Sequence, residues 1–471
     1  MQAKKLVFLE FNELCPSLLA RWMGQGVLPS FKKFHDDSQV FTGTADAREQ
    51  EFLEPWIQWY SQHTGLDYYT HNVFHLTDGP AAPYTDIWHS LLDGGLSVGN
   101  FAGMNAGKLS GRGSFYMPDP WCMTEAPFPA ELAAFHSFIA AKVQESSNAT
   151  ARLDRGAYVA FVRFLVSHGL SLESIAAIVR QLASEAMGRP IGWKRAALLD
   201  QLQADIFLHY WKRAKPDFAS IFMNSTAHFQ HAYFHAIDDP DSDATHRDAV
   251  LFGYQSMDRF LGRFFAELEP AGAMLVLTSA LSQQSNPDGG SKYYRLRDAA
   301  ALFERLGIVA KALLPVMSHQ YSAVFADAAA AEDARRRLAQ VTCGGRQVFQ
   351  FGSSPEDTLF FDNGFRSTMA QDATVVITEG SQVENFGYFD LFYLIPHTKS
   401  GIHHPDSVIW LKTGIHHVHP DRVSILDVFP TVRDYYGVDD APRDGLARKG
   451  SSLLPSLGIG RYRADFAVAA E

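Results

Sequence analysis

The chain has 471 residues, of which 46% are hydrophobic, and it carries a formal net charge of −11 with a pI near 5.9. A chain of this length and composition can bury a large core, either in one big domain with insertions or in two or three domains. The acidic balance argues against nucleic-acid binding and against a polybasic membrane-surface protein, because phosphate backbones and anionic lipids require clustered Lys and Arg.

The cysteine content and the N-terminal segment indicate the cellular compartment in which the protein is expected. The three cysteines, Cys15, Cys122 and Cys343, have no metal-type spacing, and their odd number leaves at least one unpaired. The first residues lead directly into a strand-length apolar segment without a signal-peptide pattern, and no apolar run approaches the roughly 18 residues that span a bilayer. We expect a cytoplasmic protein without a membrane span.

In chain order, the first expected element is a buried strand at 6–13, which ends in Glu10, Asn12 and Glu13. A helix follows from Pro16, and the residues from 30 to 51 form a polar stretch. Pro55 and Gly65 then bound a helix of about two to three turns, with Glu54 at its N-terminal end. A further strand is expected at 96–104.

The rest of the chain alternates in a similar way. Helical spacing predicts helices between 129 and 215, at 244–268 and at 423–436, whereas short apolar runs predict strands at 219–223, 274–278 and 408–411. Strands and helices mix between 288 and 397.

The expected fold class is α/β, with a mainly parallel sheet that has helices on both faces. We assign residues 1–128, 216–287 and 398–471 to this core. Residues 129–215 form a helical insertion, and residues 288–397 form a smaller α+β insertion.

Polar residues follow several of the predicted strands at their carboxyl ends. The strand at 219–223 is followed by Asn224, His228, Gln230 and His231. In open α/β sheets the ligand crevice lies outside the carboxyl ends of the strands. We therefore expect a functional site at this edge of the sheet.

Several short motifs occur along the chain, in the order Gly26-Val-Leu-Pro-Ser-Phe31, Ser61 with Thr64-Gly65, Asn224-Ser-Thr-Ala-His228, Ser279-Ala-Leu-Ser282, Gly401-Ile-His403 and Asp427-Val-Phe-Pro-Thr431. In this order the motifs resemble those of the alkaline phosphatase superfamily, in particular its type I phosphodiesterase/nucleotide pyrophosphatase branch. The resemblance implies an alkaline phosphatase-like fold. It also implies a hydrolase or group transferase that acts on a phosphorylated or other anionic small molecule.

The metal ligands of the family are only partly present. His228 and His403 match family ligands, but Glu10 replaces the first Asp, the nucleophile position falls on Glu54 or Pro55, Asn224 replaces another Asp, and Ala280-Leu281 replaces an Asp-His pair. A two-metal site needs several carboxylates to neutralise the ions.

We therefore expect at most one ion, zinc or a similar divalent transition metal, on His228 and His403, with His231 or a carboxylate as a further ligand. The alternative is that the three histidines bind substrate without metal.

Glu10, Glu54 and His231 are the candidate catalytic residues. Glu54, and Glu10 with Glu13, could form a general acid/base pair whose pKa values are separated by burial and mutual repulsion. The alternatives are a carboxylate that the helix dipole favours at Glu54 and a solvent-facing helix start at Glu13.

The candidate substrate-binding residues are amides that lie near the ends of the predicted elements, namely Asn12, Gln58, Asn105, Asn224, Gln230 and Gln283. The expected partner is a small anionic substrate, with a nucleotide-sugar or a glycan precursor among the candidates. The alternative function is a non-catalytic pseudoenzyme that binds a small anionic ligand or a protein partner. The sequence leaves a homo-oligomer open.

Overall fold

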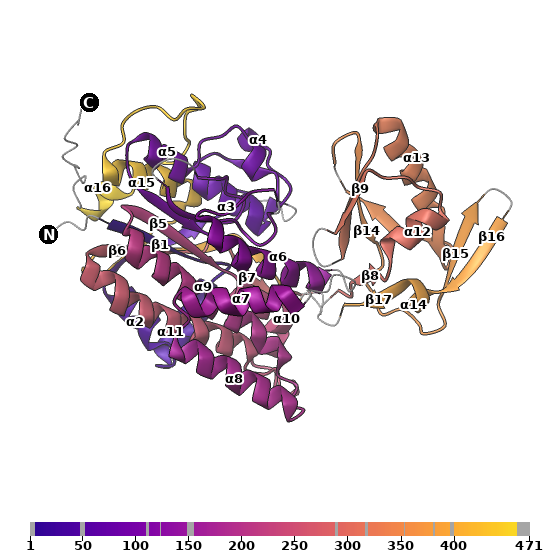
Figure 1. Ribbon diagram of the computed structural model, residues 1–471, viewed down its shortest axis with the longest axis horizontal. Coiled ribbons are helices and arrows are strands. Elements are labelled where there is room, and N and C mark those ends of the chain that lie inside the picture. The colour runs from indigo at the N-terminus through magenta and orange to yellow at the C-terminus, as the bar shows by residue number, and fades with distance from the viewer. Residues whose placement is uncertain are drawn as a thin grey trace. The chain divides into compact units, whose positions relative to one another are not determined.

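The computed structural model describes residues 5–47, 52–109, 113–122, 124–147, 155–287, 291–315, 319–352, 354–379, 382–395 and 400–458. The chain divides into two compact units (Figure 1). Unit 1 comprises Met1–Ala140, Asp154–Ser285 and Gly401–Glu471, and unit 2 comprises Ala141–Leu153 and Asn286–Ser400.

Unit 1 is built on a nine-stranded sheet in the order β20-β2-β19-β6-β1-β5-β3-β4, with β21 paired to β2. The strands are β1 (Lys5–Phe11), β2 (Ser38–Thr44), β3 (Val98–Phe101), β4 (Gly113–Met117), β5 (Phe218–Met223), β6 (Ala273–Thr278), β19 (Asp406–Lys412), β20 (His417–Val418) and β21 (Val423–Ser424). All the strand pairs are parallel except those that β19 makes with β6 and β2. The predicted mainly parallel α/β sheet is confirmed.

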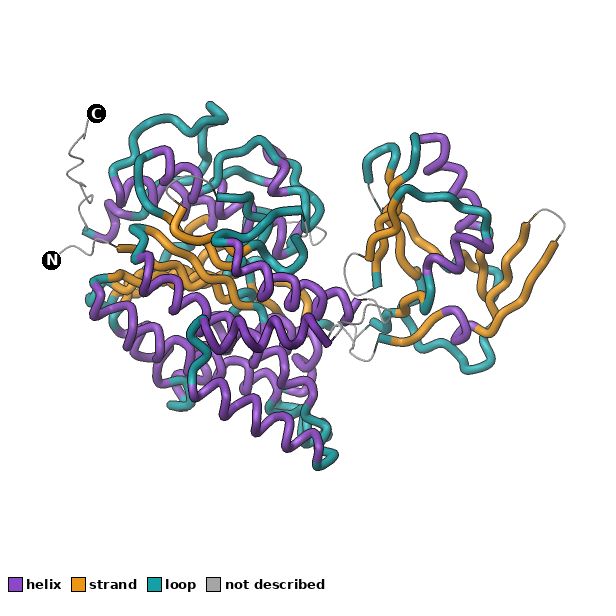
Figure 2. Tube along the Cα trace, viewed as in Figure 1, coloured by secondary structure: helices purple, strands orange, loops and turns teal. Residues whose placement is uncertain are grey.

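Helices cover both faces of this sheet (Figures 1 and 2). On one face α15 (Val428–Tyr436) contacts α3 (Pro55–Thr64) and α5 (Ile87–Asp93), and on the other α11 (Ala249–Leu268) contacts α2 (Pro29–Asp36) and α9 (Arg195–Ala214). The central strands β1 and β5 are almost entirely buried, because helices cover them on both sides. This explains why their sequences are continuous apolar runs.

Residues 38–44 differ from the expected polar stretch, because they form β2 next to β19. The segment contains Thr, Gly, Ser and Gln rather than an apolar run, and its strand conformation is secured by pairing along the full length of β19. The tendency of a segment to form a strand depends strongly on the strands that pair with it, and a local sequence pattern does not show these strands.

The helices described between residues 129 and 215 are α6 (Ala133–Ser147), α7 (Arg155–Ser167), α8 (Leu172–Ala186) and α9, with short 3₁₀ turns before α6 and α9. The long helix predicted at 244–268 begins later, at Ala249, and its expected apolar face, including Tyr254, Met257 and Phe260, is buried. Among the residues that the structure describes, no helix is both long and apolar enough to cross a membrane.

Unit 2 is an α+β structure with its own core. Its two four-stranded sheets have the orders β13-β14-β10-β9 and β12-β11-β15-β16, and all of their pairings are antiparallel. The strands are β9 (Ala312–Pro315), β10 (Gln320–Val324), β11 (Val341–Cys343), β12 (Arg346–Gln347), β13 (Phe349–Phe351), β14 (Thr358–Asn363), β15 (Thr374–Glu379) and β16 (Gln382–Gly387). The helices α12 (Ala299–Arg305) and α13 (Ala328–Ala339) contribute Phe303 and Leu338 to a core that also contains Phe361 and Tyr388.

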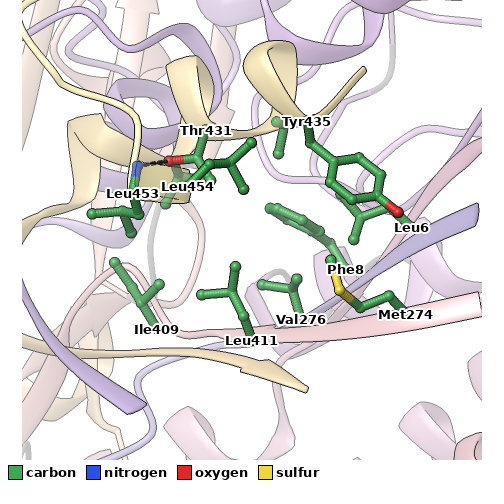
Figure 3. Close-up of a pocket in the computed structure, with 12 residues that line it drawn as sticks. Leu6, Phe8, Met274, Val276, Ile409, Leu411, Thr431, Tyr435, Leu453 and Leu454 are labelled. Carbon is green, nitrogen blue, oxygen red and sulfur yellow. Dashed lines mark hydrogen bonds between the residues drawn. The ribbon is translucent and has the colours of Figure 1, made fainter. Parts of the chain in front are cut away.

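A small apolar cavity of about 20 Å³ lies between the sheet of unit 1 and α15 (Figure 3). Leu6, Val276 and Ile409 line it from the sheet, and Val432 lines it from α15. A water molecule would fit by volume, but it needs two to four polar partners. Thr431 and Tyr435 are the lining residues with hydroxyl groups, but the surface that faces the cavity is apolar, and the Thr431 hydroxyl donates to Asp427 O at 2.5 Å. The cavity is a packing gap and not a ligand site.

The Val432→Ile variant is expected to fill part of this gap. One added methylene should raise the free energy of unfolding of unit 1 by about 0.5–1 kcal/mol. Urea unfolding followed by tryptophan fluorescence measures this unit, because all eight tryptophans lie within it. Val432→Ala, the control, should lose about 1–3 kcal/mol. A clear destabilisation by Val432→Ile would show that the gap cannot accept a methylene.

The first turn of α5 contains a partly buried ion pair. Asp86 Oδ1 accepts a hydrogen bond from the backbone amide of His89 at 2.8 Å and lies 2.8 Å from His89 Nδ1. The charge of Asp86 raises the pKa of His89 to about 9, and this effect outweighs the opposing effect of burial. Because the folded-state pKa lies above the ordinary value, the pair stabilises the protein fully below pH 6.5, and this contribution is lost as the pH rises through about 9.

We therefore expect His89→Gln to lower the free energy of unfolding by about 1–3 kcal/mol at pH 6 and by much less at pH 10. Urea titrations at the two pH values measure the difference between variant and wild type. The control is His235→Gln at an exposed position, whose effect should be small at both pH values. An equal loss for His89→Gln at pH 6 and pH 10 would show that charge is not the cause.

Candidate metal centre

The end of β1 turns sharply into the site. Asn12 and Glu13 follow the strand, and Glu13 has a left-handed backbone with φ of 59°. Their amides donate to Met223 O at 2.9 Å and to Ser279 O at 3.4 Å, at the ends of the neighbouring strands. The Glu13 side chain is buried, with 1% exposed, so the alternative that it faces solvent at a helix start is wrong.

Four side chains surround the Glu13 carboxylate. Asn12 Nδ2 donates to Oε1 at 2.9 Å, and Gln283 Nε2 donates to Oε2. The Nε2 atoms of His231 and His403 lie 3.3 and 3.6 Å from Oε2. Burial alone would raise the pKa of Glu13, but the two imidazoles outweigh burial and lower this pKa to about 2. Glu13 is therefore a carboxylate at neutral pH.

The two histidines come from distant segments of the chain. His231 lies in α10 (Ser225–Tyr233), which begins directly after β5, so the predicted polar cluster at 224–231 is helical. His403 lies in β18 (Gly401–His404), which pairs with β7 (Ser282–Ser285) so that His403 is opposite Gln283. This ribbon therefore delivers both His403 and Gln283 to Glu13.

Gly401 allows the ribbon to approach α10. A Cβ atom at this position would lie 2.7 Å from the carbonyl oxygen of Gln230, which is closer than side-chain carbons come to other atoms. The same approach places Gly401 O at 3.1 Å from His231 Nδ1. A larger residue would push β18 away from α10.

The second ring nitrogens orient both imidazoles. A carbonyl oxygen only accepts hydrogen bonds, so His231 Nδ1 carries the proton that faces Gly401 O, and Nε2 is the ring nitrogen that faces Glu13. His403 Nδ1 lies 3.5 Å from Glu54 Oε2. Metal-binding histidines are typically oriented in this way by a carbonyl or a carboxylate.

The spacing of the ligand atoms fits a metal ion. The ligand atoms of Glu13, His231 and His403 all lie within 4.8 Å of one another. At bond lengths of about 2.0–2.2 Å, two ligands of a tetrahedral zinc ion are about 3.3–3.6 Å apart. The 3.3 and 3.6 Å found here match these separations and exceed the roughly 2.7–2.9 Å of charge-assisted hydrogen bonds. Two histidines and one carboxylate can hold catalytic zinc and leave a fourth position open.

The structure places His228 outside this group. Its side chain is exposed, one turn of α10 before His231, and it is not among the grouped ligands of the described residues. The set that the fold brings together is therefore Glu13, His231 and His403, in place of the expected pair of His228 and His403.

The other two predicted catalytic carboxylates lie in different surroundings. Glu54 precedes α3 without capping it through its side chain, and its carboxylate is 25% exposed beside His403. Glu10 is buried, and its Oε1 lies 3.0 Å from His63 Nε2, which is also buried. Glu10 thus pairs with α3 and does not join the Glu13 group.

Asn12 has no spare hydrogen-bonding group for a substrate. Its Oδ1 accepts from Trp59 Nε1 at 2.7 Å, and its Nδ2 donates to Glu13 and to Asn224 Oδ1 at 2.8 Å. Asn224, which is half-buried, is thereby linked to Glu13 through Asn12. Both are predicted substrate-binding residues, whereas these contacts are internal.

Gln58 and Asn105 also make internal hydrogen bonds. Gln58 accepts from the amide of Asp46 at 2.8 Å and donates to Phe52 O at 2.9 Å. Asn105 accepts from the amide of Gly79 at 3.1 Å and donates to two backbone carbonyls. Both side chains are fully buried, so they hold loops together.

Gln230 and Gln283 support Glu13 directly. Gln230 Nε2 donates to the backbone oxygen of Glu13 at 2.7 Å, and its Oε1 accepts from Tyr254 at 2.9 Å. Gln283 donates to the Glu13 carboxylate and to Ala227 O. Both amides are buried and hold Glu13 in position.

No second ion site adjoins this one at Ala280 and Leu281, which are fully buried and offer no ligand atoms. The other group of His and Asp side chains found among the described residues, His35, Asp36 and His416, is partly exposed. In that group Lys32 already binds Asp36, so its carboxylate is neutralised by a neighbour.

No protein-family model and no curated protein sequence matches the chain. Among solved structures, it is similar to phosphonoacetate hydrolase from Sinorhizobium meliloti 1021 in complex with phosphonoacetate, at 14% identity and a TM-score of 0.42, over 90% of this chain and 94% of that one. Murine ectonucleotide pyrophosphatase/phosphodiesterase 5 is similar at 11% identity and a TM-score of 0.42, over 95% and 97% of the two chains. Wild-type alkaline phosphatase PafA is similar at 12% identity and a TM-score of 0.46, over 96% and 98%.

These three proteins belong to the alkaline phosphatase superfamily, which is the family that the sequence motifs resemble. Because the identities are low and the TM-scores lie below 0.5, they carry no residue roles over to this chain.

Proposed function

We propose that this protein is a divergent, hydrolase-type member of the alkaline phosphatase superfamily that acts on a small phosphorylated or other anionic molecule with a single divalent transition metal, such as zinc. The observation that carries the proposal is the group of Glu13, His231 and His403, with its separations of 3.3 and 3.6 Å; Glu13 and His403 are buried and His231 is partly exposed. A nucleotide-sugar or a glycan precursor is the substrate class that we favour, from the resemblance of the motifs.

Glu13, His231 and His403 would hold the ion. When bound, such an ion polarises an ester oxygen and lowers the pKa of a coordinated water. Asn12 and Gln283 keep the Glu13 carboxylate in place through their amide donors. Gly401 O keeps the proton of His231 on Nδ1.

Glu54 is the proposed acid/base residue. Its carboxylate is partly exposed at the edge of the group, where it can exchange a proton with a bound substrate or with solvent. The same carboxylate lies 3.5 Å from His403 Nδ1 and so orients this ring. Glu10 has a positioning role instead, because its pair with His63 ties β1 to α3.

The test is an assay of the purified protein against a phosphomonoester, a phosphodiester, a phosphonate monoester and a sulfate ester, with the protein chelator-treated and then reloaded with zinc. We expect about one equivalent of metal in the protein as purified, and hydrolysis of at least one ester that chelation abolishes and zinc restores. Two equivalents would contradict the single-ion site, and activity that survives full metal removal would contradict the metal-dependent mechanism.

Several amides that are predicted to bind substrate form hydrogen bonds within the protein instead. This favours a second candidate function, a pseudoenzyme that binds an anionic ligand without turnover. The side-chain amides of Asn12, Gln58 and Asn105 form hydrogen bonds within the protein. This candidate predicts one bound metal and tight binding of an intact phosphorylated ligand, measured by calorimetry, without product from any of the four esters.

A further inference from the structure

Helix α8 is amphipathic with its apolar side turned outwards. Its buried residues are Ser174 and Gln181, whereas Leu172, Ile175, Val179 and Leu182 are between 41% and 84% exposed. Gln181 donates to Ile191 O at 2.8 Å, so the polar side of the helix is occupied by contacts within the chain. The apolar side is left without a partner in the described structure of one copy.

The exposed apolar residues of α8 form one continuous face. Leu172, Ile175, Val179 and Leu182 follow a spacing of three and four residues, which places them on one side of a helix. Ala176, Ala183 and Ala186 are also exposed and lie along the same side. Small side chains of this kind let another helix approach closely, and a contiguous apolar face usually marks an interaction site. The face defined by these seven residues is called here the α8 face.

Two opposite charges flank the α8 face on one edge. Glu173 and Arg180 are both exposed and seven residues apart; Ala176 is three residues from Glu173 and four from Arg180, and Ala183 is three residues from Arg180. In an antiparallel pair of identical helices, the same edges of the two helices meet. If Leu172 lies opposite Leu182 of a second copy, then Ile175 lies opposite Val179, and Glu173 of each copy comes beside Arg180 of the other.

We propose that the α8 face binds the α8 face of a second copy of this chain in an antiparallel, twofold-symmetric pair. The apolar residues provide the contact, and the charge pairs on the edge set the register. The charges of α8 itself disfavour an anionic membrane as the occupant, because the helix carries Glu173 and Glu185 against a single Arg180. The net charge of −11 of the whole chain has the same effect.

Sedimentation equilibrium of the full-length protein tests the proposal. The wild type should form a dimer of 52.4 kDa chains in the micromolar range. The double variant Val179→Glu/Leu182→Glu should raise the dissociation constant at least 100-fold, while its thermal unfolding in the monomeric state is maintained, because both side chains are exposed. Val309→Glu, at a still more exposed apolar position in unit 2, is the control and should dimerise like wild type.

A charge exchange tests the antiparallel register. Glu173→Arg alone and Arg180→Glu alone should each weaken the dimer by about 3- to 30-fold, because two symmetric pairs become repulsive. The combined Glu173→Arg/Arg180→Glu variant should restore most of the affinity. Arg259 of α11 also interacts with both charges within one chain, so the readout is the dissociation constant and not stability.

Four outcomes would overturn the proposal. A wild type that stays monomeric at 100 µM, or a Val179→Glu/Leu182→Glu variant that dimerises normally, would exclude the α8 face as the dimer contact. Binding of the monomeric wild type to phosphatidylglycerol vesicles, lost in that variant, would assign the face to a membrane. A combined charge exchange that is weaker than both single variants would exclude the antiparallel register.

Discussion

The Glu13→Gln variant is expected to bind zinc at least 100-fold more weakly than the wild type and to lose any metal-dependent hydrolysis. The substitution keeps the size of the side chain, but a neutral amide replaces the only carboxylate of the proposed ligand set. Competition with a chromophoric chelator measures the affinity, and elemental analysis of the purified variant measures occupancy. His231→Ala and His403→Ala should have effects of the same size.

His228→Ala is the matched control for these variants. It removes an imidazole from the same helix as His231, but at an exposed position outside the ligand group. Its zinc affinity should equal that of the wild type. Loss of metal in His228→Ala together with normal binding in Glu13→Gln would refute the centre described here and favour the pair expected from the motifs.

The Asn12→Leu variant should lower the free energy of unfolding of unit 1 by about 3–5 kcal/mol, since buried polar groups that lose their partners are costly. Leucine has a similar shape, but it leaves Trp59 Nε1, Glu13 Oε1 and Asn224 Oδ1 without the bonds that Asn12 makes to them. Urea unfolding followed by tryptophan fluorescence measures the loss.

Gln25→Leu is the control, because it replaces an amide by leucine at an exposed position of the same unit and should change stability by less than about 0.5 kcal/mol. A loss of under 1 kcal/mol in Asn12→Leu would show that the Asn12 contacts are not maintained in solution. It would also reopen a direct role of this amide in substrate binding.

The sequence by itself determined the fold class and the edge of the sheet at which the site lies. The runs predicted at 6–13, 219–223 and 274–278 correspond to the three central parallel strands β1, β5 and β6. These runs are mainly apolar because helices cover such strands on both faces. The polar residues that follow these runs do gather at the carboxyl ends of the strands, as this class of sheet predicts. His403, predicted from its motif, lies in the candidate centre.

Only the tertiary structure decided which of these polar residues belong together. Glu10 lies in β1 and Glu13 lies two residues after its end, and a left-handed turn at Glu13 directs the two carboxylates to different partners, His63 and the two ligand histidines. His228 and His231 are separated by one turn of α10, and only His231 lies beside Gly401. The sequence likewise predicts that the amide side chains contact a ligand, whereas in the structure they form internal hydrogen bonds. A local sequence pattern does not show in which direction a turn points a side chain, nor which distant residue that side chain then meets. These two features of the fold determine which residues can bind the ion together.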